Sequence, residues 1–245
     1  MIKLIVSDFD GTLCPYGSAG VPRGVRERIS SLLERGTVFA VSSGRTYGEL
    51  IRYLPELANS AYFICCDGAY YIKNGRLLYS RHIALEDLKL LAGVSGASFV
   101  FHGAETNYGL GTLPDEAARF NCVPISRIGE IGERVFKVTS YGCKLRLPPY
   151  CGLRMHWDGG ENDGAQYVNR FCDKGAALSD LQMRLMLTKF DTACLGDSGN
   201  DIAMMHNAKF SFCVGSHSPA LEGICTVSVD SAEQALTAIL ATQDK

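Results

Sequence analysis

The sequence predicts an α/β fold in which a Rossmann-like parallel sheet is interrupted by an inserted α+β domain. Short apolar runs alternate with segments of helical period in both end regions of the chain, a pattern typical of parallel sheets. Between these regions the pattern changes to short alternating runs that glycine-rich turns separate. With 245 residues, the chain is long enough to bury a core and to carry such an insert.

The N-terminal part of the predicted sheet consists of three buried strands with helices between them. The runs Ile2–Ser7, Thr37–Ser42 and Ala61–Cys66 are apolar without alternation, as expected for parallel strands covered on both faces. Apolar residues recur at helical spacing over residues 22–36, which begin near a proline and end at a glycine. A second helix is expected at Thr46–Leu54, where a proline follows.

The insert follows a hairpin signal, Asn74-Gly75, and we place it at residues 82–169, with the core at residues 1–81 and 170–245. The elements expected within it are helical pieces at Leu85–Leu91 and Asp115–Phe120, antiparallel strands at 144–147, 153–157 and 165–169, and a glycine-rich turn at 159–164.

Strand–helix alternation returns in the C-terminal part. The expected elements are a helix at 175–187, strands at Ala193–Leu195, Phe210–Val214 and Thr226–Val229, a short helix at Ile202–His206 and a last helix at Ala232–Ala241. These elements complete the sheet that the N-terminal strands begin.

Charge and hydropathy exclude several partners. Lys and Arg number 24 and Asp and Glu number 26, so the formal net charge of −2 provides no bulk attraction to nucleic acid or to an anionic membrane. No apolar run approaches the roughly 20 residues of a membrane-spanning helix, and the first residues lack the pattern of a signal peptide. We therefore expect a cytoplasmic protein that binds neither nucleic acid nor membranes; its oligomeric state is unknown.

The ten cysteines have no C-x-x-C spacing. Without a signal peptide, we expect them to be buried, reduced thiols rather than a disulfide framework, with a zinc site as the alternative.

Two clusters of acidic residues follow predicted strands. Asp8 and Asp10 come directly after the first strand, and Asp197, Asn200 and Asp201 come after the strand at Ala193–Leu195. Ligands of open parallel sheets bind at the carboxyl ends of the strands, and paired carboxylates suit Mg²⁺. Alone, the first cluster is also compatible with a calcium loop or a turn, and the second with a polar turn that caps a helix.

Two further motifs carry groups suited to an anion. Ser43, Gly44 and Arg45 end the second strand with a hydroxyl, a flexible backbone and a guanidinium, and Lys174 stands at the start of a helix. Taken alone, the first motif is as compatible with an ordinary loop, and a lysine at a helix start is usually solvated.

Together the four motifs, in the order DxDGT, SGR, Lys and GDxxND, resemble the haloacid dehalogenase (HAD) superfamily of phosphohydrolases over the whole chain. The position of the insert resembles a C2-type cap, and GDSGNDIAM with DKGAAL is most similar to the Cof-like or IIB branch. Trehalose- and sucrose-phosphate phosphatases share parts of these motifs. The chain departs from the family where Ser43 replaces the usual threonine, and where Asp67 stands in place of a frequent asparagine.

The resemblance implies a Mg²⁺-dependent phosphatase that acts on a small phosphorylated metabolite, most simply a sugar phosphate, through an aspartyl-phosphate. It implies that Asp8 is the nucleophile and Asp10 the general acid and base. The implied metal ligands are Asp8, Asp10 through its backbone carbonyl, Asp197 and Asp201, and the implied phosphate ligands are Ser43, Gly44, Arg45, Lys174 and Asn200.

Two other functions remain open from the sequence: a phosphomutase of the same superfamily, and a non-catalytic module that binds a phosphorylated metabolite. The resemblance also implies that the insert reads the leaving group. Its polar and aromatic side chains are candidates for this role or for ordinary packing: His102, Glu105, Asn107, Tyr108, His156, Trp157 and Asp158.

Overall fold

The computed structural model describes residues 1–157 and 164–243, and the chain divides into two compact units. The core unit comprises residues 1–45, 49–79 and 173–245, and the inserted unit comprises residues 46–48 and 80–172. The core unit has a largely parallel sheet with helices on both faces, which confirms the predicted α/β class.

Eight strands form the sheet of the core unit within the described residues, in the order β14-β13-β12-β1-β2-β3-β4-β5. All pairs from β14 to β3 are parallel, and β4 is antiparallel to β3. The bounds are β1 Leu4–Asp8, β2 Val38–Ser42, β3 Tyr62–Cys65, β4 Tyr70–Lys73, β5 Arg76–Ser80, β12 Thr192–Gly196, β13 Phe210–Val214 and β14 Val227–Val229. Every residue of β1 is buried, which explains why its sequence shows no alternation.

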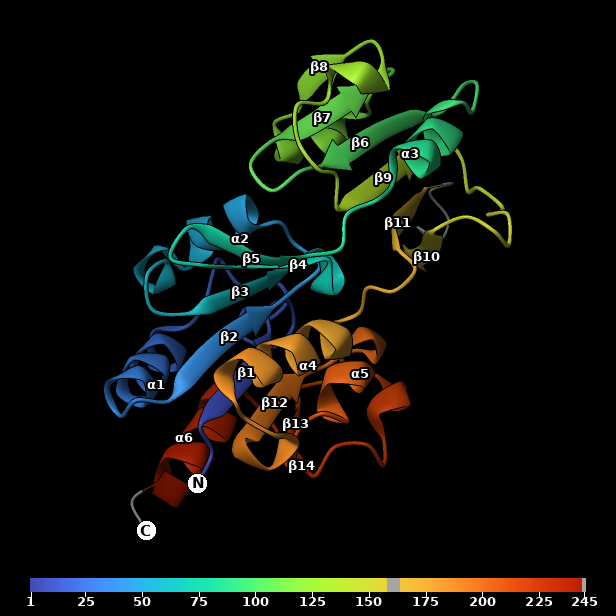
Figure 1. Cartoon of the computed structure of the whole chain (residues 1–245). Coiled ribbons are helices and arrows are strands. Elements are labelled where there is room, and N and C mark those ends of the chain that lie inside the picture. The colour runs from blue at the N-terminus through green and yellow to red at the C-terminus, as the bar shows by residue number, and fades with distance from the viewer. Residues whose placement is uncertain (158–163, 244–245) are drawn as a thin grey trace. The chain divides into compact units, whose positions relative to one another are not determined.

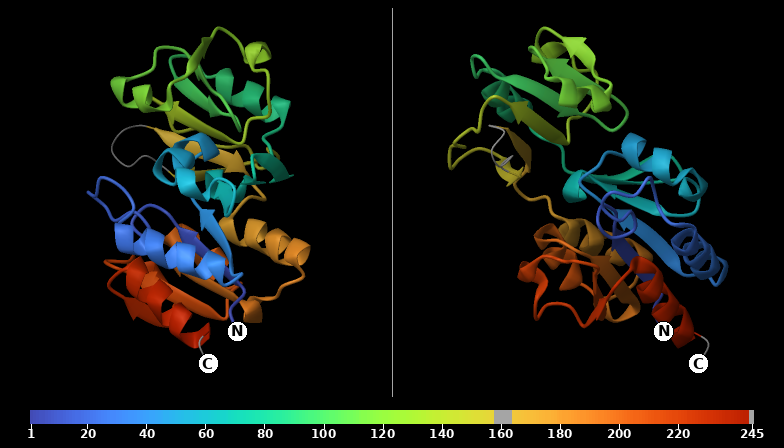
Figure 2. Two further views of the ribbon diagram at one scale, coloured as in Figure 1. Left: turned by 90° about the vertical axis from the view of Figure 1, so that its left-hand side faces the viewer. Right: turned by 180° about the vertical axis from the view of Figure 1, so that it is seen from behind.

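Helices cover both faces of this sheet. The helices α1 (Arg23–Glu34) and α6 (Ala232–Gln243) pack together on one face, and α4 (Lys174–Leu185) and α5 (Ile202–Met205) cover the other (Figure 1; Figure 2, left). The short helix α2 (Tyr47–Tyr53) follows β2.

Helix α4 begins one residue earlier than predicted. The side chain of Asp173 accepts a hydrogen bond of 2.7 Å from the backbone N–H of Ala176 and so caps the helix. Its apolar face, including Leu178 and Leu181, packs against the strands. The cap therefore places Lys174 in the first turn of the helix.

The inserted unit has its own sheet, with six strands within the described residues in the order β10-β11-β9-β6-β7-β8. Its pairs are antiparallel as predicted, except that β7 and β8 run parallel. The bounds are β6 Ser98–His102, β7 Asn107–Leu110, β8 Val123–Ile125, β9 Lys137–Tyr141, β10 Leu153–Trp157 and β11 Ala165–Asn169. Helix α3 (Leu85–Ala92) packs Leu88 and Leu91 on this sheet, and Asp115–Phe120 forms a 3-10 helix.

The predicted strand at 144–147 is wrong. The backbone N–H of Leu145 donates to the hydroxyl of Tyr167 (2.7 Å) instead of to a neighbouring strand. Pro148 and Pro149 follow directly, and proline has no N–H to offer a ladder. The turn expected at 159–164 lies, except for Gly164, outside the described residues, as does Asp158.

The prediction of free thiols is wrong for one pair, because Cys213 and Cys225 form a disulfide. Their Cα atoms lie 5.7 Å apart, within the range that a disulfide spans. The two residues are 12 positions apart, so no spacing motif marked them. The other eight cysteines form no disulfide, and most of them are buried.

None of the helices in the described part of the chain combines the length and apolar character that crossing a membrane requires.

Candidate active site

Parallel pairing brings the sequence motifs to one edge of the core sheet. Strands β12, β1 and β2 are neighbours, and Asp8 at the end of β1 pairs with Ser42 at the end of β2. Asp197 follows β12 directly. Side chains that are almost 190 residues apart in sequence therefore meet where the strands end.

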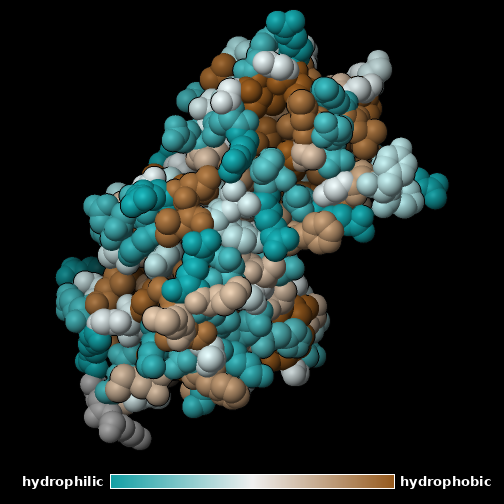
Figure 3. Space-filling view, in the orientation of Figure 1, coloured by the Kyte–Doolittle hydropathy of each residue, from teal (hydrophilic) through white to brown (hydrophobic). Residues whose placement is uncertain are grey.

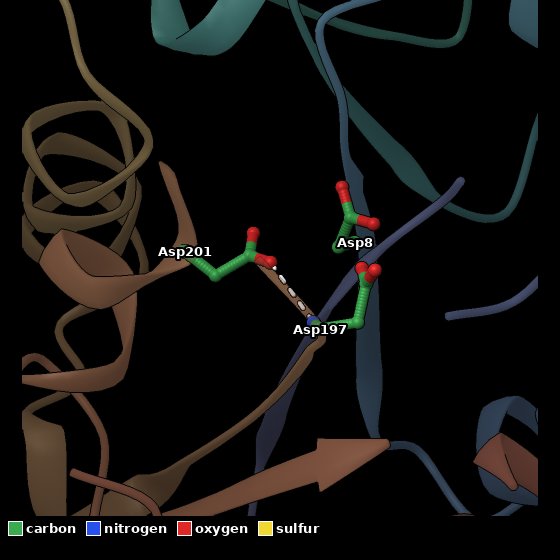
Figure 4. Close-up of side chains that lie close together, drawn as sticks. All are labelled: Asp8, Asp197 and Asp201. Atoms are coloured by element: carbon green, nitrogen blue, oxygen red, sulfur yellow. Dashed lines mark hydrogen bonds between the residues drawn. The ribbon is translucent and has the colours of Figure 1, made fainter. Parts of the chain in front are cut away.

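Three carboxylates converge at this edge: Asp8, Asp197 and Asp201 (Figure 4). They offer oxygen atoms that all lie within 4.8 Å of one another, and all three residues are buried. Burial, followed by the charge of Asp201, raises the pKa of Asp197, although the hydrogen bonds from Thr12 and Tyr16 oppose this effect. Burial also raises the pKa of Asp8, and the neighbouring carboxylates add to that effect, although Lys174 opposes it.

This donor set fits a divalent cation. Buried carboxylates repel one another unless a positive charge lies among them, and an all-oxygen set is what Mg²⁺ prefers. The side chain of Asp10 does not join the cluster found among the described residues. Its carboxylate is bonded to Arg45 instead.

Asp197 is held by two hydroxyl groups from the loop after β1. Thr12 donates from Oγ1 to Oδ1 (3.1 Å), and Tyr16 donates from its hydroxyl to Oδ2 (3.2 Å). Gly11 allows this approach, because it has a φ of +82° and a Cβ there would lie 2.4 Å from Oδ2 of Asp197. Sequence reasoning missed Tyr16, which lies in a loop without a periodic pattern.

Lys174 lies between two of the carboxylates. Its Nζ donates to Oδ1 of Asp8 (2.5 Å) and to Oδ1 of Asp201 (2.7 Å), and its side chain is 1% exposed. Burial alone would lower the pKa of Lys174, but the charges of Asp201, Asp8 and Asp67 outweigh it and raise that pKa. Lys174 is therefore a buried cation, which excludes the alternative of a solvated lysine at a helix start.

Asp201 also stabilises the loop that follows β12. Its Oδ2 accepts hydrogen bonds from the backbone N–H groups of Asp197 (3.1 Å) and Ser198 (3.0 Å). One carboxylate thus orients both Lys174 and the backbone that carries Asp197.

Arg45 makes a two-pronged ion pair with Asp10. Its Nε donates to Oδ2 (2.8 Å) and one terminal nitrogen donates to Oδ1 (2.7 Å). The guanidinium also lies over the rings of Phe9 and Tyr53, at 5.3 and 5.0 Å from the ring centroids. The hydrogen bonds to Asp10 raise the pKa of Arg45 further above its already high value. Arg45 thus fixes the orientation of the Asp10 carboxylate, two residues after the candidate nucleophile Asp8.

Asn200 lies in the turn after β12 and bonds to Asp67, which the sequence analysis noted only as a departure from the family pattern. Its Nδ2 donates to Oδ1 of Asp67 (3.1 Å), and its Oδ1 accepts from Oγ of Ser198 (2.6 Å). Ser43, buried at 1% exposure, accepts the backbone N–H of Arg45 at its Oγ (3.1 Å). The candidate phosphate ligands thus belong to the same unit as the carboxylates.

The family model of haloacid dehalogenase-like hydrolases matches residues 5–114 and 141–239. Among curated proteins, an Escherichia coli protein named 5-amino-6-(5-phospho-D-ribitylamino)uracil phosphatase is 22% identical, with 87% of this chain and 85% of the relative covered. An HMP-PP phosphatase of Cronobacter sakazakii is 25% identical, with 90% and 87% covered.

Solved structures share the fold over nearly the whole chain. The Streptococcus mutans protein SMU.1108c superposes with a TM-score of 0.83 at 20% identity and covers all of both chains. A sugar phosphatase of HAD subclass IIB has a TM-score of 0.80 at 19% identity, with 97% of this chain and 98% of that chain covered. Because the family model spans most of the chain, this protein belongs to the haloacid dehalogenase-like hydrolases, as an enzyme of the phosphatase type.

Proposed function

We propose that the chain is a Mg²⁺-dependent phosphomonoester hydrolase that works through an aspartyl-phosphate on Asp8. The observation that carries the proposal is the position of Asp8, buried in contact with the cation of Lys174 and within reach of Asp197 and Asp201. A carboxylate in such a place can attack an electrophilic phosphorus while the groups around it balance charge.

In the proposed reaction, an oxygen of Asp8 forms a bond to phosphorus as the bond to the leaving alcohol breaks. Asp10 gives its proton to the alcohol oxygen, and in the second step takes a proton from the water that attacks the aspartyl-phosphate. Phosphate then leaves and Asp8 is restored. Before the first transfer Asp10 must leave its ion pair with Arg45 and take up a proton from solvent, because the paired carboxylate has none to give. The proton that it takes from water in the second step restores the acid form for the next turnover.

Mg²⁺, when bound, neutralises the charge between the phosphate and the carboxylates. We assign its ligands as Asp8, the backbone carbonyl of Asp10, Asp197 and Asp201, of which the three side chains form the buried cluster. Thr12 and Tyr16 orient Asp197 for this task.

The phosphoryl oxygens are bound, in this proposal, by donors from three elements of the core unit: Ser43, Gly44, Arg45, Lys174 and Asn200. Lys174 supports the assignment best, because it is buried as a cation and touches the nucleophile. Cations and N–H groups stabilise the charge that spreads over the equatorial oxygens during transfer.

The substrate that we propose is a small phosphorylated metabolite, with sugar phosphates as the first class to test. Two curated relatives are named for a ribitylaminouracil phosphate and for HMP-PP, so these two compounds belong in the same panel.

We further propose that residues 82–169 serve as a cap that reads the leaving group. His102 is not a free contact for this role, since it is fully buried and bonded to Asn107 and Thr139.

The test is release of free phosphate from a panel of phosphorylated metabolites, with Mg²⁺ and with EDTA. We expect metal-dependent release by the wild type and none by Asp8→Asn, whereas Asp230→Asn, a change at an exposed loop carboxylate, keeps full turnover. Turnover by Asp8→Asn, or equal release in EDTA, would contradict the proposal. A sugar 1-phosphate that is converted to an isomeric sugar phosphate without phosphate release would identify a phosphomutase instead.

A further inference from the structure

The turn Cys66–Gly68, which follows β3, contacts each segment that carries a candidate phosphate ligand. The backbone N–H of Asp67 donates to the carbonyl of Ser43 (3.0 Å), and that of Cys66 donates to the carbonyl of Arg45 (2.9 Å). Gly68 lies against the start of α4, where a Cβ would be 2.1 Å from the carbonyl oxygen of Asp173. The turn thus joins the loop after β2 to the helix of Lys174.

Asp67 has a left-handed backbone and a buried carboxylate in this turn. Its φ of +55° lies in the left-handed region, which costs energy for residues other than glycine, and its side chain is almost fully buried at 1% exposure. Gly44 accommodates the carboxylate, because a Cβ there would lie 3.0 Å from Oδ2 of Asp67. Asp67 is therefore a strained, buried carboxylate that lies next to Gly44, one of the candidate phosphate ligands.

The contact with Asn200 indicates that role. Oδ1 of Asp67 accepts from Nδ2 of Asn200 (3.1 Å), while Oδ1 of Asn200 accepts from Ser198 (2.6 Å). An ionised carboxylate only accepts hydrogen bonds, so it tolerates the NH₂ end of the amide and repels the oxygen end. An asparagine at position 67 could accept or donate and would tolerate both amide orientations.

We propose that Asp67 is a positioning residue that acts through Asn200: it fixes the amide so that the second N–H of Nδ2 faces the phosphoryl group. The inference rests on the proposed function, because that function makes Asn200 a phosphate ligand. The positioning role also predicts the direction in which phosphate binding changes when Asp67 is replaced. Removing a buried negative charge should by itself tighten the binding of an anion, whereas losing the position of Asn200 should weaken it.

The test is a double-mutant cycle of Asp67→Gly and Asn200→Ala, with the Kd for inorganic phosphate in the presence of Mg²⁺ as the readout. Glycine removes the carboxylate and adopts the same φ without strain. We expect Asp67→Gly to weaken phosphate binding about five- to tenfold, the scale of the net contribution of one ordinary hydrogen bond. In the Asn200→Ala background the same change should no longer weaken binding, and the loss of the buried negative charge should leave the Kd unchanged or lower it.

Two controls separate positioning from folding. Asn74→Gly places a glycine at another left-handed position of the core unit, in an exposed hairpin turn, and should leave the Kd unchanged. Asp67→Asn keeps an acceptor oxygen and should weaken binding less than Asp67→Gly does. If Asp67→Gly fails to fold, as judged by circular dichroism, the cycle is made with Asp67→Asn.

Tighter or unchanged phosphate binding in Asp67→Gly, or effects that add fully to those of Asn200→Ala, would overturn the inference. Turnover of wild-type protein separates this result from the proposed function. An active wild type with an additive cycle refutes the role of Asp67 alone. An inactive wild type that binds phosphate with a coupled cycle refutes hydrolysis and supports the positioning role. A wild type that binds no phosphate refutes the inference.

Discussion

The core unit and the inserted unit bury different kinds of polar group. Near the ends of its central strands the core unit buries Asp8, Asp201 and Lys174, and the ammonium of Lys174 donates to both carboxylates. In the inserted unit the imidazole of His102 is fully buried between Asn107 and Thr139, and burial lowers its pKa well below the ordinary value. That histidine is therefore held neutral within the sheet.

This difference separates a chemical role from a structural one. Burying full charges is costly and is sustained only by close partners, so the cluster of the core unit indicates a site built for an ionic reactant. A neutral, fully bonded imidazole stabilises a sheet and offers nothing to a ligand. Figure 3 shows hydrophobic residues among hydrophilic ones on the face of the inserted unit that is turned to the viewer.

The largest effect that this comparison predicts comes from Lys174→Ala. Two buried carboxylates would lose their cation, so we expect the free energy of unfolding to fall by about 3–5 kcal/mol in EDTA. We expect kcat to fall by roughly 10³-fold, because charge stabilisation in the transition state is lost. Denaturant unfolding and phosphate release measure the two effects, and Lys189→Ala, at an exposed lysine of the same unit, is the control. A Lys174→Ala protein as stable as the wild type would contradict the electrostatic account.

Mg²⁺ should stabilise the core unit and not the inserted unit. At a Mg²⁺ concentration of 100 times the Kd, we expect about 2.7 kcal/mol of added protection. Hydrogen exchange resolved by segment measures it, since β1 and β12 belong to the core unit and β6 and β9 to the inserted unit. Asp197→Asn should remove the added protection. Equal protection of both units in Asp197→Asn would show that the cation binds elsewhere.

The inserted unit should lose stability in acid because of His102. Burial, with the nearby charge of Lys137, lowers the folded-state pKa of His102 below the unfolded value of about 6.5. The unfolded chain then binds more protons, so stability is full above this pH and falls below it, by at most about 1.4 kcal/mol per pH unit.

Segment-resolved hydrogen exchange at pH 7.5 and pH 5.5 measures this loss in β6 and β9. His102→Gln should show a smaller difference between the two pH values, whereas His82→Gln, at an exposed histidine, should behave as the wild type does. A loss that persists unchanged in His102→Gln would assign the acid sensitivity to another group.

The smallest effect belongs to Tyr16→Phe. Asp197 would lose one of its two hydroxyl donors and keep Thr12, so we expect the Mg²⁺ concentration for half-maximal activity to rise about threefold. Removal of a single hydrogen bond should leave kcat at saturating Mg²⁺ nearly unchanged. Tyr150→Phe, at an exposed tyrosine of the inserted unit, provides the matched control. No change in metal dependence would mean that Tyr16 does not orient Asp197.

Much of the core unit could be predicted from the sequence, because parallel strands buried on both faces leave a direct apolar signal. The run at Phe210–Val214 matches β13 at both ends. The acidic clusters could also be predicted to meet, since neighbouring parallel strands end at one edge. The pairing of Arg45 with Asp10 could not, because it depends on rotamers and on the rings of Phe9 and Tyr53.

The inserted unit was less predictable, because its signals are short. The alternating run at 144–147 has the pattern of a strand, but the backbone N–H of Leu145 bonds to a tyrosine hydroxyl. The disulfide of Cys213 and Cys225 and the contact of Asp67 with Asn200 share one cause of failure: both depend on turns that bring distant residues together, which no local spacing encodes.

The most direct test of the central claim is to trap the phosphorylated enzyme. Protein is mixed with Mg²⁺ and a phosphomonoester that it hydrolyses, and the reaction is quenched in acid within the first turnover. The protein is then digested and examined by peptide mass spectrometry. The account predicts that the peptide with Asp8 gains one phosphoryl group, located on Asp8 and not on Asp10, and that Asp8→Asn gains none. Rapid phosphate release by wild-type protein with Asp8 unmodified at every quench time would contradict it.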